Sequence, residues 1–148
     1  MNDKATASGG QIDGQTFDPA AHGWVRHETV GFNELIGPLW RHEEGERLRF
    51  GVVIAPKHLN RIAIVHGGML ATFADQAMGM TARKAHGNKK HATIELSLQF
   101  VGSVQLGEFV EAHSEVVRMT RSIMFMRTTL VAGTRKVATA SGIWKILE

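Results

Sequence analysis

The residues best suited to chemistry lie in one stretch of the chain, between Asn60 and Ala82. His66 stands directly before the glycine pair Gly67-Gly68, and Asp75, eight residues after Gly67, is the sole carboxylate between Arg61 and Arg83. A helix that begins at glycine offers free backbone N–H groups and lets a ligand come close. An acid in apolar surroundings is a candidate nucleophile or general base. A backbone donor and an acid together are what acyl transfer to water requires.

Each of these residues also has a purely structural interpretation. His66 could hold the turn before the helix through a hydrogen bond, as half-buried histidines commonly do. The glycine pair could simply permit close packing of helix on sheet. Asp75 could belong to a polar stripe of the helix, although aspartate is a poor helix former in mid-helix. Asn60 taken alone is typical of a turn.

These residues must be positioned by a helix that we expect from about Gly67 to Ala85. Small and apolar side chains cover more than one stripe of it, which indicates that the helix is buried on most sides. Gly87-Asn88 ends it. A short helix is predicted at 32–36, before Gly37-Pro38, and the first 22 residues, rich in Gly, Ala, Ser and Thr, are predicted to be a flexible tail.

Alternating apolar and polar residues predict strands at 39–43, 48–54, 91–100, 109–117, 122–132 and 135–146. In the strand at 91–100, alternation places Ala92, Ile94, Leu96, Leu98 and Phe100 on one face and Thr93 on the other. The short connections after residue 91 require antiparallel pairing. The fold class is therefore α+β: one long central helix wrapped by a curved antiparallel sheet of five to six strands, in a single domain over 23–148.

Composition narrows the functions. The chain has 148 residues, 43% hydrophobic content and a net charge of +3, with no cysteine, which excludes disulfides, thiolate nucleophiles and Cys-based zinc sites. Lys and Arg are scattered, so a nucleic-acid partner is not expected. No metal-ligand spacing of histidines, secretory signal or membrane span is expected, and we predict a cytoplasmic protein without a cofactor. The sequence contains no Gly-x-Ser-x-Gly motif, so a serine hydrolase is not expected.

The combined pattern resembles the hotdog-fold thioesterases, in particular the PaaI-like acyl-CoA thioesterase branch. The resemblance covers roughly residues 32–147. It rests on Asn60, on Val65-His66-Gly67-Gly68 opening the helix, and on Ala74-Asp75 inside this order of strands.

The resemblance implies a role for each motif residue. Gly67 supplies a backbone N–H to the thioester carbonyl, and Asp75, from the opposite subunit, is nucleophile or general base. Asn60 helps to hold the site. Thr93 stands where some members keep a Ser or Thr that positions water. The remaining residues implied in substrate binding are His66, Gly68, and Arg118, Arg121 and Ser122 of a turn similar to one that contacts coenzyme A phosphates, although Thr120 replaces its usual glycine.

The function implied is hydrolysis of an acyl-CoA to free acid and CoA by a homodimer or a dimer of dimers. Two other interpretations remain open: a non-catalytic acyl-CoA-binding or sensing protein on the same fold, and a hotdog enoyl-CoA hydratase or dehydratase. The identity of the acyl group is not readable from the sequence.

Overall fold

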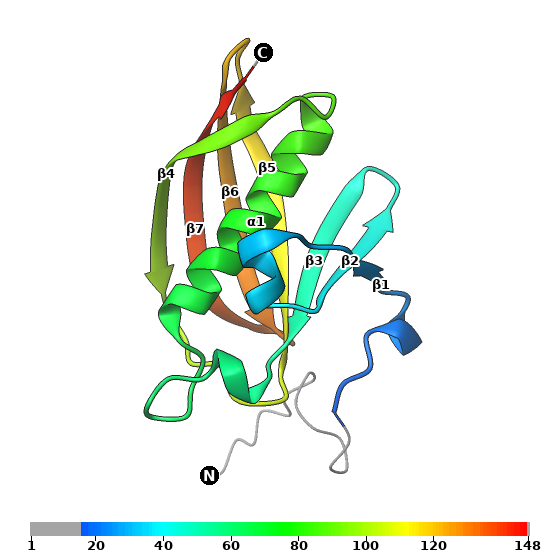
Figure 1. Cartoon of the computed structure of the whole chain (residues 1–148), viewed down its shortest axis with the longest axis vertical. Helices are drawn as coiled ribbons and strands as arrows, with labels where there is room; N and C mark the ends of the chain where they lie inside the picture. Colours follow the sequence, from blue (N-terminus) through cyan, green and yellow to red (C-terminus); the bar gives the residue numbers. More distant parts are fainter. Residues whose placement is uncertain (1–15, 148) are drawn as a thin grey trace.

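The computed structural model describes residues 16–147; positions 1–15 of the predicted tail, and residue 148, lie outside the described part. One helix, α1 (Gly67–Ala85), runs through the centre of the molecule, with the bounds that the sequence predicts (Figure 1). The ring of His66 caps its first turn, since Nδ1 accepts a 2.8 Å hydrogen bond from the Gly68 N–H. Beyond the C-cap residue His86, Gly87 has a φ of 79°, which glycine adopts readily.

The strands form one antiparallel sheet in the order β1-β2-β3-β5-β6-β7-β4. This is seven strands, so the predicted number of five to six was too low. The missed strand, β1, has three residues, too few to show an alternating pattern. The bounds are β1 Val25–His27, β2 Leu39–Glu44, β3 Arg47–Val53, β4 His91–Phe100, β5 Phe109–Met119, β6 Ile123–Ala132 and β7 Arg135–Ile146.

The sheet curves around α1, and β1 and β4 are its two edges (Figure 1). Helix residues that face the sheet are buried: Met69, Leu70, Phe73, Ala74, Ala77, Met78, Gly79 and Ala82. They meet the inward side chains of the strands in one apolar core, in which Phe50, Leu130 and Trp144 are among the largest fully buried side chains. The arrangement confirms the predicted α+β class.

Three 3₁₀ helices complete the described chain: η1 (Ala20–His22), η2 (Gly31–Leu35) and η3 (Pro56–His58). The predicted short helix at 32–36 corresponds to η2, which crosses in front of α1 in Figure 1. Asn33 ties η2 to α1 by donating a 2.8 Å hydrogen bond to Oε1 of Gln76. In the stretch predicted as a tail, Phe17 stacks on the ring of Phe109 at 4.6 Å between centroids.

The prediction of which face each residue of β4 occupies was wrong for the first part of the strand. The pairing with β7 shifts register between Thr93 and Glu95, so a bulge interrupts the alternation. Leu96 and Leu98 pack against the core, whereas Ile94 is 58% exposed. The extra residue turns Thr93 to the same face as the leucines, towards α1. The bulge therefore brings the Thr93 hydroxyl next to α1, whereas simple alternation assigns it to the opposite face of the sheet.

His58 connects three segments that precede α1. Its Nε2–H donates to the Ile36 carbonyl at 2.8 Å, its Nδ1 accepts from the Ala55 N–H at 3.0 Å, and its own carbonyl accepts from the His66 N–H at 2.8 Å. Burial lowers the pKa of His58, and Lys57 adds to this, while the bond to the Ile36 carbonyl opposes it. The neutral ring is the form that fits this site.

We expect His58→Ala to lower the free energy of unfolding by about 2–4 kcal/mol, because it orphans a buried donor and a buried acceptor. An unfolded histidine has a pKa of about 6.5, above that of folded His58, so the wild type should lose stability as the pH falls below that value. Burial also lowers the pKa values of His27 and His91, so these two residues likewise make the wild type less stable as the pH falls. The test is therefore a difference: denaturant unfolding of wild type and variant between about pH 7.5 and pH 5.5 should show a shallower pH dependence in the variant. Parallel curves would contradict this role of His58.

Candidate active site

The start of α1 carries a backbone N–H that has no acceptor within the described part of the chain. The Gly68 N–H bonds the His66 ring, and the Met69 and Leu70 N–H groups bond the His66 carbonyl at 3.0 and 3.3 Å. Among residues 16–147, no acceptor takes a hydrogen bond from the Gly67 N–H. A helix N-terminus with a free N–H attracts negative charge. Gly67 is therefore placed to stabilise an oxyanion.

Close neighbours explain why both positions at the start of α1 are glycine. A Cβ on Gly68 would lie 3.0 Å from Nδ1 of His66, so a side chain there would disturb the cap. A Cβ on Gly67 would lie 3.2 Å from the ring of Phe100, at the end of β4. His66 thus has a structural role as the helix cap, which was one of the two interpretations left open by the sequence.

Asp75 lies two turns further along α1 and is partly buried. Thr93 of β4 donates a 2.8 Å hydrogen bond from Oγ1 to Oδ1 of Asp75. This contact orients the carboxylate and leaves Oδ2 available to another group. The structure therefore brings together the acid and the hydroxyl that the sequence analysis singled out, through the bulge in β4.

Gly67 and Asp75 of one chain cannot serve the same carbonyl group. They are eight residues apart on one straight helix, which separates them by about 12 Å along its axis. A reacting carbonyl needs both the oxyanion donor and the attacking group within about 3 Å. A site that uses both residues must combine Gly67 of one copy with Asp75 of another.

Asn60 organises the loop that leads into α1. Its Oδ1 accepts hydrogen bonds from the backbone N–H groups of Ile62 and Ile64, at 3.0 and 3.3 Å. Its side chain also lines an open cavity of about 760 Å³ together with His66, Arg61, Ile62 and Leu59. Asn60 and His66 therefore line the same cavity at the mouth of the helix.

The predicted basic turn is only partly assembled. Arg121 and Ser122, between β5 and β6, line a cavity of about 720 Å³, whereas Arg118 does not. Two further cations line it, Lys89 from the turn after α1 and Lys145 from β7. Neither lysine was predicted from the sequence, because no local pattern links residues from three separate segments. Three cations around one cavity suit an anionic ligand.

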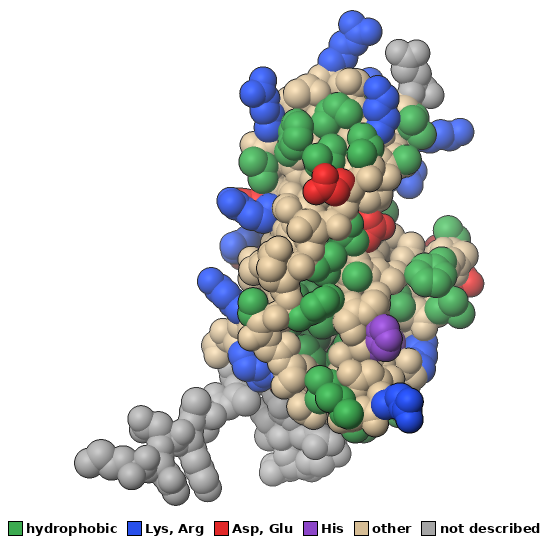
Figure 2. All heavy atoms as spheres, turned by 90° about the vertical axis from the view of Figure 1, so that its left-hand side faces the viewer, with side chains coloured by type: hydrophobic (Ala, Val, Ile, Leu, Met, Phe, Trp, Pro, Cys, Tyr) green, Lys and Arg blue, Asp and Glu red, His purple; other side chains and the backbone are tan. Residues whose placement is uncertain are grey.

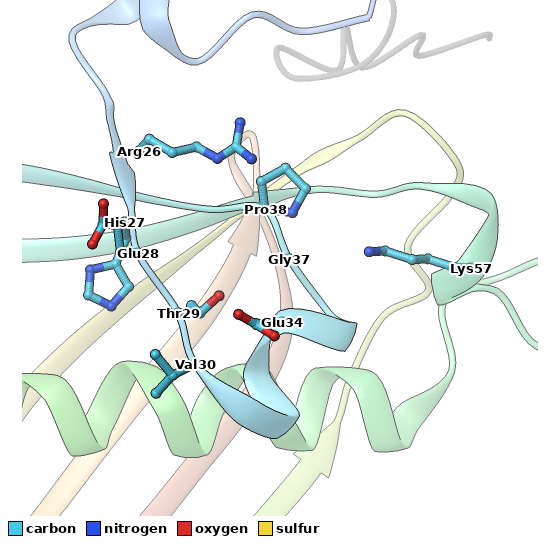
Figure 3. Close-up of a pocket in the computed structure, with 9 residues that line it drawn as sticks. All are labelled: Arg26, His27, Glu28, Thr29, Val30, Glu34, Gly37, Pro38 and Lys57. Atoms are coloured by element: carbon cyan, nitrogen blue, oxygen red, sulfur yellow. The ribbon is translucent and has the colours of Figure 1, made fainter.

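A further cavity of about 540 Å³ lies between the β1–η2 segment and η3 and contains none of the predicted site residues (Figure 3). Its wall includes two cations, Arg26 and Lys57, and two acids, Glu28 and Glu34. These charges balance, so the cavity offers no clear preference for an anion.

Residues 16–147 contain no cluster of three or more His, Cys, Asp or Glu side chains that could hold a metal ion. Within the same residues, no helix is long and apolar enough to cross a membrane.

A single long helix within a curved antiparallel sheet defines a hotdog-type fold. The family model described as "Thioesterase superfamily" matches residues 63–139. The chain belongs to this superfamily, which confirms the resemblance drawn from the sequence.

Known proteins agree with this assignment. A Pseudomonas aeruginosa protein that carries a provisional esterase name is 31% identical over 115 residues, 76% of this chain and 86% of that protein. A mutant of the phenylacetic acid degradation protein PaaI from Thermus thermophilus has a TM-score of 0.70 at 23% identity, over 78% of this chain and 98% of that one. A Bacillus halodurans protein solved with CoA has a TM-score of 0.66 at 25% identity, over 73% of each chain.

Proposed function

We propose that the protein hydrolyses an acyl-CoA thioester to a free acid and CoA. The observation that carries this proposal is the pair of prepared groups: the unused Gly67 N–H at the helix mouth and the Asp75 carboxylate oriented by Thr93. Family membership supports thioester chemistry, and the similar Bacillus halodurans protein was solved with CoA. The cations around the Arg121 cavity suit the phosphates of such a ligand.

In the proposed reaction, the thioester oxygen accepts a hydrogen bond from the Gly67 N–H. Asp75 of the partner copy either attacks the carbonyl carbon through Oδ2, or removes a proton from a water molecule that attacks it. The carbon–sulfur bond breaks, and CoA leaves as the thiolate. In the first route, water then hydrolyses the mixed anhydride on Asp75. One turnover in ¹⁸O-labelled water reports on the routes: an unlabelled acid, with ¹⁸O left on Asp75, requires the first route with water attack at the Asp75 carboxyl carbon of the anhydride, whereas direct attack by water always labels the acid.

The partner copy would dock along β4. This strand is an edge of the described sheet and ends beside exposed apolar side chains: Phe100 is 54% and Val101 60% exposed. Figure 2 views the molecule from the side on which β4 lies, and hydrophobic side chains gather in a column along that face. Pairing two edges would cover this surface and place the two α1 helices on one continuous sheet. We propose a homodimer of this kind, which can pair further into a dimer of dimers.

The test is a screen of short-chain, medium-chain and aryl acyl-CoAs, followed by a thiol reagent. We expect stoichiometric release of free thiol from at least one class. Tight binding without thiol release would instead support the acyl-CoA-binding interpretation. When an enoyl-CoA is added to the screen, loss of its enoyl absorbance without thiol release would support a hydratase.

We expect Thr93→Val to lower kcat by about 10- to 100-fold, because the isosteric side chain no longer fixes the Asp75 carboxylate. Thr93→Ser keeps the hydroxyl and is the matched control, expected to stay within about threefold of the wild type. Steady-state thiol release with the best substrate from the screen provides the measurement. Equal rates for the Val and Ser variants would show that the hydrogen bond has no part in the reaction.

A further inference from the structure

The three faces of η2 meet different surroundings. A 3₁₀ helix has about three residues per turn, so side chains at i and i+3 lie one above the other. Phe32 and Leu35 share one face in this way. Asn33 faces α1, where it donates its 2.8 Å hydrogen bond to Gln76. Glu34 lines the cavity of about 540 Å³ between the β1–η2 segment and η3 (Figure 3). The face with Phe32 and Leu35 is therefore turned away from that cavity.

This third face of η2 is an exposed apolar stripe. Phe32 is 67% and Leu35 66% exposed. Figure 2 views the molecule from the side on which β4 lies, and hydrophobic side chains cover the part that projects on the right, where η2 lies in front of α1. Neighbouring exposed apolar side chains, unlike single ones, mark contact sites. The stripe is visible from the side on which we propose that the partner copy docks.

The hydrogen bond of Asn33 fixes the level of the stripe along α1. Gln76 directly follows Asp75, so the two residues differ by about 1.5 Å along the helix axis. The bond from Asn33 to Gln76 therefore holds η2 over the turn of α1 that carries the acid.

The proposed dimer determines which active site each stripe serves. A two-fold axis places Gly67 of each copy beside Asp75 of the other, and this is possible only if the two α1 helices run antiparallel. Each site then lies at the level of η2 of the copy that supplies its Asp75. The stripe and the acid of one site come from the same copy, and the oxyanion donor comes from the other.

We propose that Phe32 and Leu35 form an apolar wall that binds the acyl group of the substrate beside Asp75 of the same copy. The preferred substrates are thioesters with an uncharged apolar acyl group of medium length, such as hexanoyl-CoA. Burial of the acyl chain against the two side chains favours binding, whereas an acetyl group has little surface to bury. This inference rests on the proposed thioesterase function.

The test compares hexanoyl-CoA with acetyl-CoA in Phe32→Ala and Leu35→Ala. Each variant should lower kcat/KM for hexanoyl-CoA by about 10-fold and leave kcat/KM for acetyl-CoA within about twofold, because the lost apolar contact affects the longer chain. Both side chains are exposed, so the fold should tolerate the changes. Val25→Ala, an exposed apolar residue of β1 at the opposite edge of the sheet from β4, is the matched control. Equal losses with both substrates, or no loss with either, would overturn the acyl wall.

A mixed dimer tests which copy's stripe serves a site. In a dimer of one Asp75→Asn chain and one Gly67→Val chain, the intact site takes its acid from the Gly67→Val chain. Phe32→Ala on that chain should lower kcat/KM for hexanoyl-CoA by about 10-fold, and on the Asp75→Asn chain by less than about twofold. Equal effects on the two chains would contradict the assignment. Dissociation of the Phe32→Ala protein into monomers would show that the stripe is a contact between copies, and would overturn the acyl wall.

A binding measurement separates this inference from the proposed function. Calorimetry uses the non-hydrolysable analogues of hexanoyl-CoA and acetyl-CoA, in which a CH₂ stands between sulfur and carbonyl. A hexanoyl preference in binding, lost in Phe32→Ala, without hydrolysis of either thioester, would support the acyl wall and contradict the thioesterase. Hydrolysis of hexanoyl-CoA at equal kcat/KM by wild type and Phe32→Ala would support the thioesterase and contradict the acyl wall.

Discussion

Asp75→Asn is expected to lower kcat for acyl-CoA hydrolysis by about 10³- to 10⁴-fold, the largest effect of any single change. The amide has the size of the carboxylate, and its Oδ1 can still accept the Thr93 hydrogen bond that orients the acid at 2.8 Å. It can neither attack a carbonyl carbon nor take a proton from water. Helix packing and acyl-CoA affinity should therefore persist while turnover disappears. Thiol release under substrate saturation measures the loss.

The matched control is Glu46→Gln, the same chemical change in the exposed turn between β2 and β3. It should leave kcat within about twofold of the wild type, since a surface charge there has no contact with the site. Calorimetric binding of a non-hydrolysable analogue checks that Asp75→Asn still binds. A variant that binds and turns over normally would remove Asp75 from the mechanism.

Gly67→Val is expected to lower kcat/KM by about 10²- to 10³-fold, the usual effect of losing one oxyanion donor. A backbone N–H cannot be deleted by substitution, but a side chain can obstruct it. The Cβ would already stand 3.2 Å from the Phe100 ring, so the branched methyl groups crowd the approach to the amide. Gly67→Ala, with the Cβ alone, should show a smaller loss.

Melting temperatures of the Gly67 variants distinguish an obstructed amide from a misfolded protein. The φ of Gly67 is not in the left-handed region, so both substitutions are compatible with the backbone. The melting temperatures of the Ala and Val variants should stay within about 5 °C of the wild type while their activities differ strongly. Full activity of Gly67→Val would contradict the oxyanion role of the Gly67 amide.

The sequence was enough to predict the framework. The bounds of α1 followed from the glycine pair at its start and Gly87 after its end, two signals that act locally. The long strands were equally readable, because one face of each is buried. The three-residue β1 was missed, since it depends on pairing with β2 rather than on a pattern of its own.

The candidate site was readable where its residues lie close together in the chain. His66, Gly67 and Asp75 stand on one helix and its cap, so spacing alone relates them. Thr93 came from the resemblance, whereas alternation assigned it to the wrong face because a bulge leaves no local signature in this strand. The grouping of Lys89 and Lys145 with Arg121 depends on the packing of three separate segments, and was not predictable from local spacing.

We expect one working site to combine Gly67 of one copy with Asp75 of another, because about 12 Å separates the two residues on a single helix. The decisive measurement co-expresses Asp75→Asn and Gly67→Val chains with different tags and isolates the mixed dimer. One of its two sites would carry both substitutions and the other neither, so we predict about half the activity of the wild-type dimer, from two variants that are inactive alone. A mixed dimer as inactive as its parents would show that each site is formed within one chain.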